Sequence, residues 1–157
     1  MTKSTHAAVG LRKKTKFVAT IADTGFVVAT ALVTEEAHQA CVAVYKRQGI
    51  IYLPQTTLAE VMYLLTREAG NSVAAHFILT LSETKYRIEP LLNEDIQRSG
   101  EIVQQYADSR VDFVDATIIA VAERRNITEI LTLDNRDFRM VRPKHCKYFT
   151  ILPENQS

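Results

Sequence analysis

The chain has 157 residues, of which 46% are apolar and 24% are charged, and its formal net charge is +1. This length suits one domain with a sizeable core, and the composition excludes disordered and collagen-like chains. No apolar run approaches the ~20 residues that a membrane-spanning helix needs. Two cysteines are too few for a disulfide framework. We therefore expect a cytoplasmic protein without a membrane segment.

The basic residues are unevenly distributed along the chain. Five of the 19 lie within residues 1–16, which contain no acid. Subtracting those five leaves 14 basic residues against 18 acidic ones, so the rest of the chain has a charge of −4. We predict a flexible basic arm over residues 1–16 and a single domain over residues 17–157. Proteins that merely coat nucleic acid usually have a basic body, so the acidic body indicates another role.

The first third of the chain predicts a strand, two helices and a second strand. The β-branched run Phe17–Ala22 is suited to a buried strand. Residues 23–25 then turn the chain, and a helical pattern begins at Phe26. A second helix is predicted over Glu35–Arg47, and Ile50–Leu53 is the second strand.

The middle of the chain predicts a pair of helices and a third strand. One helix opens with Thr57 and Glu60 at the spacing of a capping box and ends near Gly70. Ser72–Glu83 is a further amphipathic helix, and Tyr86–Leu91 is a strand.

The remainder predicts two more helices and two more strands. The helices cover Glu94–Asp108 and Asp112–Arg125, and Asn126 can end the second of them. The strands cover Ile130–Leu133 and Tyr148–Leu152. Strands that alternate with helices imply a parallel sheet covered by helices on both faces. We therefore predict an α/β fold, a three-layer α/β/α sandwich around a central, mostly parallel sheet.

Four acidic residues fall at one edge of this predicted sheet. Asp23 and Asp134 each follow a strand, whereas Glu60 and Asp115 lie in the first turn of a helix. Ligands of parallel sheets bind beyond the carboxyl ends of the strands. Carboxylates gathered there repel one another by about 1 kcal/mol per close pair in water, and by more under partial burial. A divalent cation would offset this repulsion, and oxygen ligands suit Mg²⁺ or Mn²⁺.

Each of these acids also has a purely structural interpretation. Glu60 has the spacing of a capping box, and Asp112 and Asp115 suit a helix amino terminus. Asp23 and Asp134 could be turn residues that bind their own backbone. The structural interpretation is the commoner one for any single acid, whereas the convergence of four favours a metal site.

Four segments together resemble the successive motifs of PIN domains. They are Ile21–Gly25, Pro54–Val61, Asp112–Ala116 and Leu131–Phe138. The resemblance covers residues 17–152 and is greatest to the single-domain VapC-type toxins of bacterial toxin–antitoxin pairs.

The resemblance implies a ribonuclease that depends on Mg²⁺ or Mn²⁺. Its acidic quartet would be Asp23, Glu60, Asp115 and Asp134, and Asp137 matches an acid that contributes in some members of the family. The expected reaction is hydrolysis of an RNA phosphodiester by a metal-activated water that attacks phosphorus in line. Whether one or two ions bind is left open.

Further residues are expected to support this chemistry. Thr24 and Thr132 match hydroxyl positions beside the acids, and Asp112 lies one turn before Asp115. A basic stretch follows Asp134 and would attract the RNA backbone. Its candidate RNA-binding residues are Arg136, Arg139, Arg142 and Lys144.

The resemblance also implies protein partners. VapC-type toxins pair as homodimers and are held inactive by a cognate antitoxin whose tail lies across the acidic groove. Some apolar side chains exceed what one helix face buries and are candidates for such an interface, although core packing is the simpler interpretation. These are Phe26, Val27, Leu32, Val33, Met62, Tyr63 and Leu65.

Two other functions fit the same sequence. One is a PIN-domain nuclease that acts in RNA processing without an antitoxin. The other is a non-catalytic RNA-binding domain whose acids serve only as caps and turns. Metal-dependent RNA cleavage would exclude the non-catalytic RNA-binding domain. Neutralisation by an antitoxin would distinguish a toxin from a nuclease of RNA processing.

Overall fold

The computed structural model describes residues 18–154. Its five strands form one sheet in the order β3-β2-β1-β4-β5, and every neighbouring pair is parallel. The strands are β1 (Thr20–Ala22), β2 (Ile51–Pro54), β3 (Tyr86–Glu89), β4 (Glu129–Leu131) and β5 (Thr150–Leu152). The predicted basic arm over residues 1–16, the first residue of the predicted first strand and residues 155–157 lie outside the described residues. The arm and the outer bounds of the domain therefore stay predictions.

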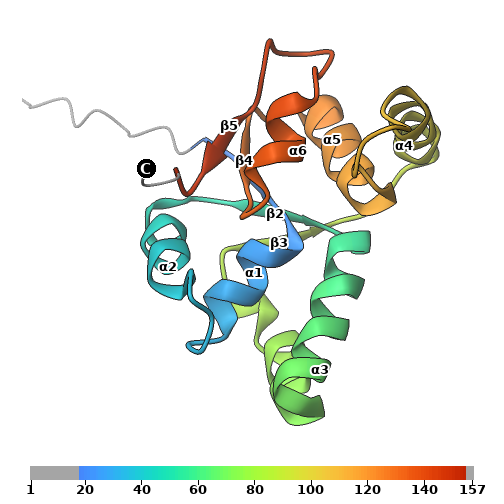
Figure 1. Ribbon diagram of the computed structural model, residues 1–157. Coiled ribbons are helices and arrows are strands. Elements are labelled where there is room, and N and C mark those ends of the chain that lie inside the picture. Colours follow the sequence, from blue (N-terminus) through green and yellow to red (C-terminus); the bar gives the residue numbers. More distant parts are fainter. Residues whose placement is uncertain (1–17, 155–157) are drawn as a thin grey trace, which may run out of the picture.

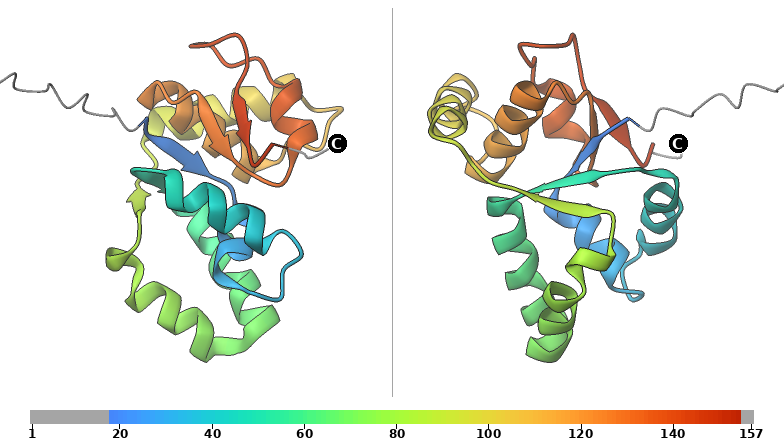
Figure 2. Two further views of the ribbon diagram at one scale, coloured as in Figure 1. Left: turned by 90° about the vertical axis from the view of Figure 1, so that its left-hand side faces the viewer. Right: turned by 180° about the vertical axis from the view of Figure 1, so that it is seen from behind.

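Helices cover both faces of the sheet, with α1 to α3 on one side and α4 to α6 on the other (Figures 1 and 2). They are α1 (Thr24–Ala31), α2 (His38–Arg47), α3 (Gln55–Leu79), the 3₁₀ helix η1 (Leu81–Glu83), α4 (Asn93–Gln105), α5 (Phe113–Arg125) and α6 (Asn135–Met140). The predicted three-layer α/β/α sandwich is confirmed. Within residues 18–154, no helix is long and apolar enough to span a bilayer.

Alternation along the central strands builds two separate cores. Ile21 and Ile130 are fully buried in the core that contains α5, whereas Ala22 and Leu131 are fully buried in the core that contains α1. Successive strand residues point to opposite faces, so each short strand supplies side chains to both layers. The sheet is therefore buried on both faces, as parallel sheets require.

The register of the central strands determines where the site forms. Ala22 pairs with Leu131, so that β1 and β4 end side by side. The next residue of each strand, Asp23 and Thr132, then leaves the sheet at the same point. The Asp23 backbone N–H donates to the Leu131 carbonyl over 2.8 Å, which extends the pairing one residue beyond β1.

Several helices begin at residues other than those predicted, α1 and α2 among them. Helix α1 begins at Thr24 and not at Phe26, because the Asp23 carboxylate accepts a hydrogen bond from the Thr24 N–H and so caps the helix at once. Helix α2 begins at His38 and not at Glu35, because residues 33–37 form turns before it. The predicted turn at residues 23–25 was therefore wrong.

A short helix, α6, follows β4 in a segment where the sequence analysis predicted no element. The Asp134 carboxylate accepts a hydrogen bond from the Asp137 N–H over 3.3 Å and caps α6. The break predicted near Gly70 is confirmed, since that residue has φ 85° and separates two helical halves within α3. Asn126 ends α5 in the left-handed conformation, as predicted.

Candidate active site

The acidic residues predicted from sequence gather around one cavity at the carboxyl edge of the sheet. Asp23 follows β1, Glu60 lies in the second turn of α3, Asp115 is in the first turn of α5 and Asp134 caps α6. The cavity has a volume of about 350 Å³. Its carboxylate-bearing lining residues are Asp23, Glu60, Asp112, Asp115, Asp134 and Asp137. The structure therefore brings together all six acids named in the sequence analysis.

Two threonines hold Asp23 at the centre of this edge. One carboxylate oxygen of Asp23 accepts from the Thr24 N–H, and the other accepts from the Thr132 hydroxyl, both over 2.7 Å. Burial raises the pKa of Asp23, the hydrogen bonds from Thr132 and Thr24 lower it, and the charges of Asp134 and Asp112 raise it again. The net result is a raised pKa, so ionised Asp23 is destabilised by its surroundings.

Asp112 and Asp115 hold each other at the start of α5. The Asp115 N–H donates to the Asp112 carboxylate over 3.0 Å, and the Asp112 N–H donates to the Asp115 carboxylate over 3.1 Å. These residues were predicted to suit a helix amino terminus, and they form a capping box there. The capping box predicted for Thr57 and Glu60 was wrong, because α3 begins at Gln55 after Pro54 without a side-chain cap, and the Thr57 hydroxyl has no hydrogen-bond partner among the described residues. Burial, followed by the charges of Asp112, Asp23 and Asp134, raises the pKa of Asp115 to about 7. Asp115 is thus a structural cap and also a member of the acidic cluster.

Thr132 connects the remaining acids to this cluster. Its hydroxyl donates to Asp23 and accepts from the Asp134 N–H over 2.9 Å. Asp137 is buried on the first turn of α6, and its pKa is raised by burial and by the charge of Asp134. Burial and the charge of Asp23 likewise raise the pKa of Glu60. Acids from four separate segments therefore act electrostatically on one another.

The chemistry of this cavity fits a hard divalent cation, although the ligand geometry is not preformed. The possible ligands are carboxylate and hydroxyl oxygens, which suit Mg²⁺ or Mn²⁺. The buried Thr24 hydroxyl has no hydrogen-bond partner in the described part of the chain. Within residues 18–154, no three His, Cys, Asp or Glu side chains form a group that could hold a metal ion as they stand. Asp23 and Asp134 also accept cap hydrogen bonds from the Thr24 and Asp137 N–H groups.

The structure divides the predicted RNA-binding stretch into two pairs. Arg142 donates to the carbonyls of residues 139–141 at the end of α6, and Lys144 reaches Glu101 of α4. The side chains of Arg136 and Arg139 form no hydrogen bond or ion pair with a residue of the described chain, although the charge of Arg136 lowers the pKa of Asp137. All four stay candidates for RNA binding, but only Arg136 and Arg139 have side chains without a hydrogen bond or ion pair to the described chain.

Arg110 was missed in the sequence analysis. It lies in the loop between α4 and α5, and it is the one basic residue among those that line the acidic cavity. Its position two residues before Asp112, the cap of α5, was the available signal.

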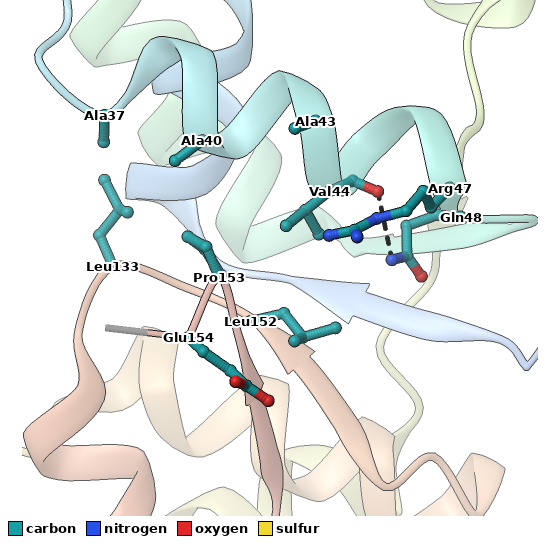
Figure 3. Close-up of a pocket in the computed structure, with 10 residues that line it drawn as sticks. All are labelled: Ala37, Ala40, Ala43, Val44, Arg47, Gln48, Leu133, Leu152, Pro153 and Glu154. Atoms are coloured by element: carbon teal, nitrogen blue, oxygen red, sulfur yellow. Dashed lines mark hydrogen bonds between the residues drawn. The ribbon is translucent and has the colours of Figure 1, made fainter. Parts of the chain in front are cut away.

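A second cavity, of about 850 Å³, adjoins the acidic one (Figure 3). Small side chains of α2 form one wall, and the residues that end β5 lie opposite them, together with Leu133. Its apolar lining consists of Ala37, Ala40, Ala43, Val44, Leu133, Leu152 and Pro153. The Leu133 side chain lies beside Gly25, which lines the acidic cavity, so the two cavities are neighbours.

Comparison with known proteins identifies the family. The model of the PIN domain matches residues 20–142. The chain belongs to the PIN domain family. The resemblance drawn from four short motifs is thereby confirmed, and the PIN domain accounts for the strands and helices that carry all six acids.

Known PIN domain proteins similar to this chain include toxins. Ribonuclease VapC26 of Mycobacterium tuberculosis is 29% identical over 96 residues, which are 61% of this chain and 71% of that protein. The crystal structure of VapC20 from the same species, a toxin that cleaves the sarcin-ricin loop, has a TM-score of 0.69 at 21% identity over 74% of this chain and 91% of that one. The crystal structure of DNA-bound VapBC from Salmonella typhimurium has a TM-score of 0.63 and is 15% identical, and the match covers 85% of this chain and 96% of that one. These two structures have the same fold as this chain.

Proposed function

We propose that this PIN domain is a metal-dependent endoribonuclease that hydrolyses RNA phosphodiester bonds, and that it is the toxin of a toxin–antitoxin pair. The observation that carries the proposal is the cavity lined by six carboxylates from four separate segments, several of which have raised pKa values. A folded protein bears such repulsion at a cost in stability. The similarity to Ribonuclease VapC26 supports RNA as the substrate.

Asp23, Asp115 and Asp134 would hold the cation, with Glu60 and Asp137 near enough to contribute. When bound, Mg²⁺ or Mn²⁺ stabilises charge on the phosphoryl oxygens and lowers the pKa of a bound water. The protein itself orients the ligands. Thr132 fixes one oxygen of Asp23, and the paired caps at the start of α5 fix Asp115.

Incubation of the purified protein with a mixed RNA pool tests the proposal. We expect internal cleavage products with Mg²⁺ and with Mn²⁺, and intact RNA when a chelator is present. Intact RNA under all three conditions would contradict a nuclease and favour the non-catalytic RNA-binding domain.

Metal binding is expected to stabilise the protein in a pH-dependent manner. The pKa of Asp115 is raised from its ordinary value to about 7, so the folded chain binds protons more tightly than the unfolded chain. That contribution to stability is complete below pH 4 and is lost as the pH rises towards 7. Above pH 7 the Asp115 carboxylate is ionised and free to bind a cation. We therefore expect Mg²⁺ to raise the thermal midpoint strongly at pH 8 and hardly at pH 5, as measured by differential scanning calorimetry.

The matched control for this measurement is the Asp115→Asn variant. Its thermal midpoint should respond less to Mg²⁺ at pH 8, because a cation ligand is absent. An equal response to Mg²⁺ at both pH values, or in both proteins, would show that the ion binds elsewhere.

The apolar groove beside α2 is the proposed contact site for the antitoxin. Its lining is largely alanine, leucine and proline, and Leu133 brings it to the edge of the acidic cavity. A partner segment with apolar side chains in the groove and a basic residue at its end would complement both cavities. Known structures of this fold include a toxin–antitoxin complex from Klebsiella pneumoniae.

Replacing Ala40 by Arg is expected to abolish neutralisation by the antitoxin. Ala40 lines the groove on the exposed face of α2, so the larger charged side chain blocks the groove without disturbing the core. RNA cleavage should be unchanged, whereas co-expression with the antitoxin encoded beside this gene should no longer rescue growth. Ala75→Arg, on the exposed face of α3, is the control. Rescue of the Ala40→Arg variant would contradict this site, and the lack of any antitoxin would favour a nuclease of RNA processing.

A homodimer and a cytoplasmic location complete the proposal. Of the apolar residues named as interface candidates, Phe26, Val27, Leu32 and Leu65 are core residues. Val33 and Tyr63 are 79% and 61% exposed, so they stay candidates for contact with a second copy.

A further inference from the structure

Arg110 stands at the rim of the acidic cavity, and no residue of the described range pairs with its side chain. It is exposed, and it alone among the cavity-lining residues carries a positive charge at every pH. Within residues 18–154, no hydrogen bond or ion pair involves its side chain. Arginines beside carboxylates commonly form bidentate pairs with them, so this unpaired state requires a reason.

The neighbouring acids are engaged with backbone groups. Asp112 and Asp115 accept hydrogen bonds from each other's N–H groups, and Asp134 accepts from the Asp137 N–H. The charges of Arg136 and Arg110 both lower the pKa of Asp137 against the stronger effect of burial, and of these two arginines only Arg110 lines the cavity. The guanidinium is thus close enough to act on the cluster electrostatically and free to bind an external anion.

We propose that Arg110 binds a phosphate group of the RNA substrate and so positions the backbone over the acids. This inference rests on the proposed function, and it names the contact by which an acidic cavity retains a polyanion. A guanidinium matches a phosphate with two parallel hydrogen bonds, and its charge offsets the repulsion from the carboxylates. The predicted basic stretch supplies this contact less well, because Arg142 and Lys144 bind groups of the protein itself and Arg136 and Arg139 do not line the cavity.

The test compares Arg110→Ala and Arg110→Lys with the parent. Binding of a fluorescent mixed-sequence RNA pool is measured in the Asp115→Asn background over a series of salt concentrations, and kcat/KM is measured in the catalytically intact background. Arg110→Ala should weaken binding and lower kcat/KM by about 10- to 100-fold. The slope of log affinity against log salt should become shallower by about 0.7, as expected for one lost phosphate contact on single-stranded RNA. Arg110→Lys should recover the slope but not the full affinity, because lysine keeps the positive charge but lacks the two parallel N–H donors of the guanidinium.

Arg67→Ala is the matched control, since it removes an exposed arginine of α3 that contacts Glu68 and Tyr63 and lies outside both cavities. It should leave affinity and slope unchanged. The inference would be overturned if Arg110→Ala had the same RNA affinity and salt slope as the parent. It would also be overturned if Arg110→Lys had the full affinity of the parent, because a positive charge alone would then account for the effect. If the parent cleaves no RNA with either ion, the proposed function fails, while the binding series still decides whether Arg110 contacts phosphate.

Discussion

The Asp115→Asn variant is expected to lose RNA cleavage by at least about 100-fold while it gains thermal stability. Electrostatic stabilisation by a bound cation is worth several kcal/mol, and each 1.4 kcal/mol is a factor of ten in rate. Asparagine retains a carbonyl oxygen that can accept the hydrogen bond from the Asp112 N–H, so the cap of α5 persists. The variant lacks the charge that burial and its acidic neighbours disfavour. Initial rates with Mg²⁺ and the thermal midpoint at pH 8 without metal measure both effects.

The opposite changes in activity and stability distinguish a cation ligand from a residue that only maintains the fold. Asp23→Asn should also lose cleavage, although its stability gain is smaller because Thr24 and Thr132 hydrogen-bond its carboxylate. Glu94→Gln, an exposed acid of α4 outside the cavity, is the control and should cleave as the parent does. Parental cleavage by Asp115→Asn would contradict its proposed role at the metal. A lower thermal midpoint would show that its main role is the cap.

The layer order and the site could be predicted from sequence because both depend on local patterns. Buried β-branched runs predict strands, and the acids that follow them are carried to one edge by the parallel topology. From sequence, a role of each acid as a helix cap or turn residue and a role as a cation ligand could be predicted only as alternatives. In the structure both alternatives hold for Asp115, which caps α5 and also belongs to the cavity.

Features that depend on long-range packing were not predicted. Helix α6 has only six residues, and it forms because Asp134 caps it where β4 and β5 end together. Arg110 belongs to no periodic pattern, and its position at the cavity follows from the way α4 and α5 pack. The groove beside α2 exists only because Leu133 and the end of β5 face the alanines of that helix (Figure 3).

Replacing Arg124 by Met is expected to destabilise the fold by about 3 kcal/mol without direct contact with the active site. The Arg124 guanidinium binds Asp95 over 2.9 Å and Glu89 over 2.8 Å, and these side chains are only 2% and 4% exposed. Breaking a buried ion pair by removing one partner typically costs about 3–5 kcal/mol, because the other charge is left buried. We expect the lower end, since Arg125 still pairs with Glu89 over 2.7 Å. Chemical denaturation at pH 7 measures the difference.

The pH dependence of that difference identifies its cause. Burial would raise the pKa of Glu89, but hydrogen bonds from Arg125 and Arg124 outweigh burial and hold the pKa below its ordinary value. A lowered carboxyl pKa contributes stability above the unfolded pKa of about 4.3 and loses it as the pH falls through the folded pKa. The gap between the free energies of unfolding of the parent and Arg124→Met should therefore narrow as the pH falls through the lowered pKa of Glu89. A difference in the free energy of unfolding that is constant from pH 7 to pH 3 would instead indicate lost packing. Arg67→Met, which removes one partner of an exposed ion pair, is the control, and its free energy of unfolding should differ little from that of the parent at any pH.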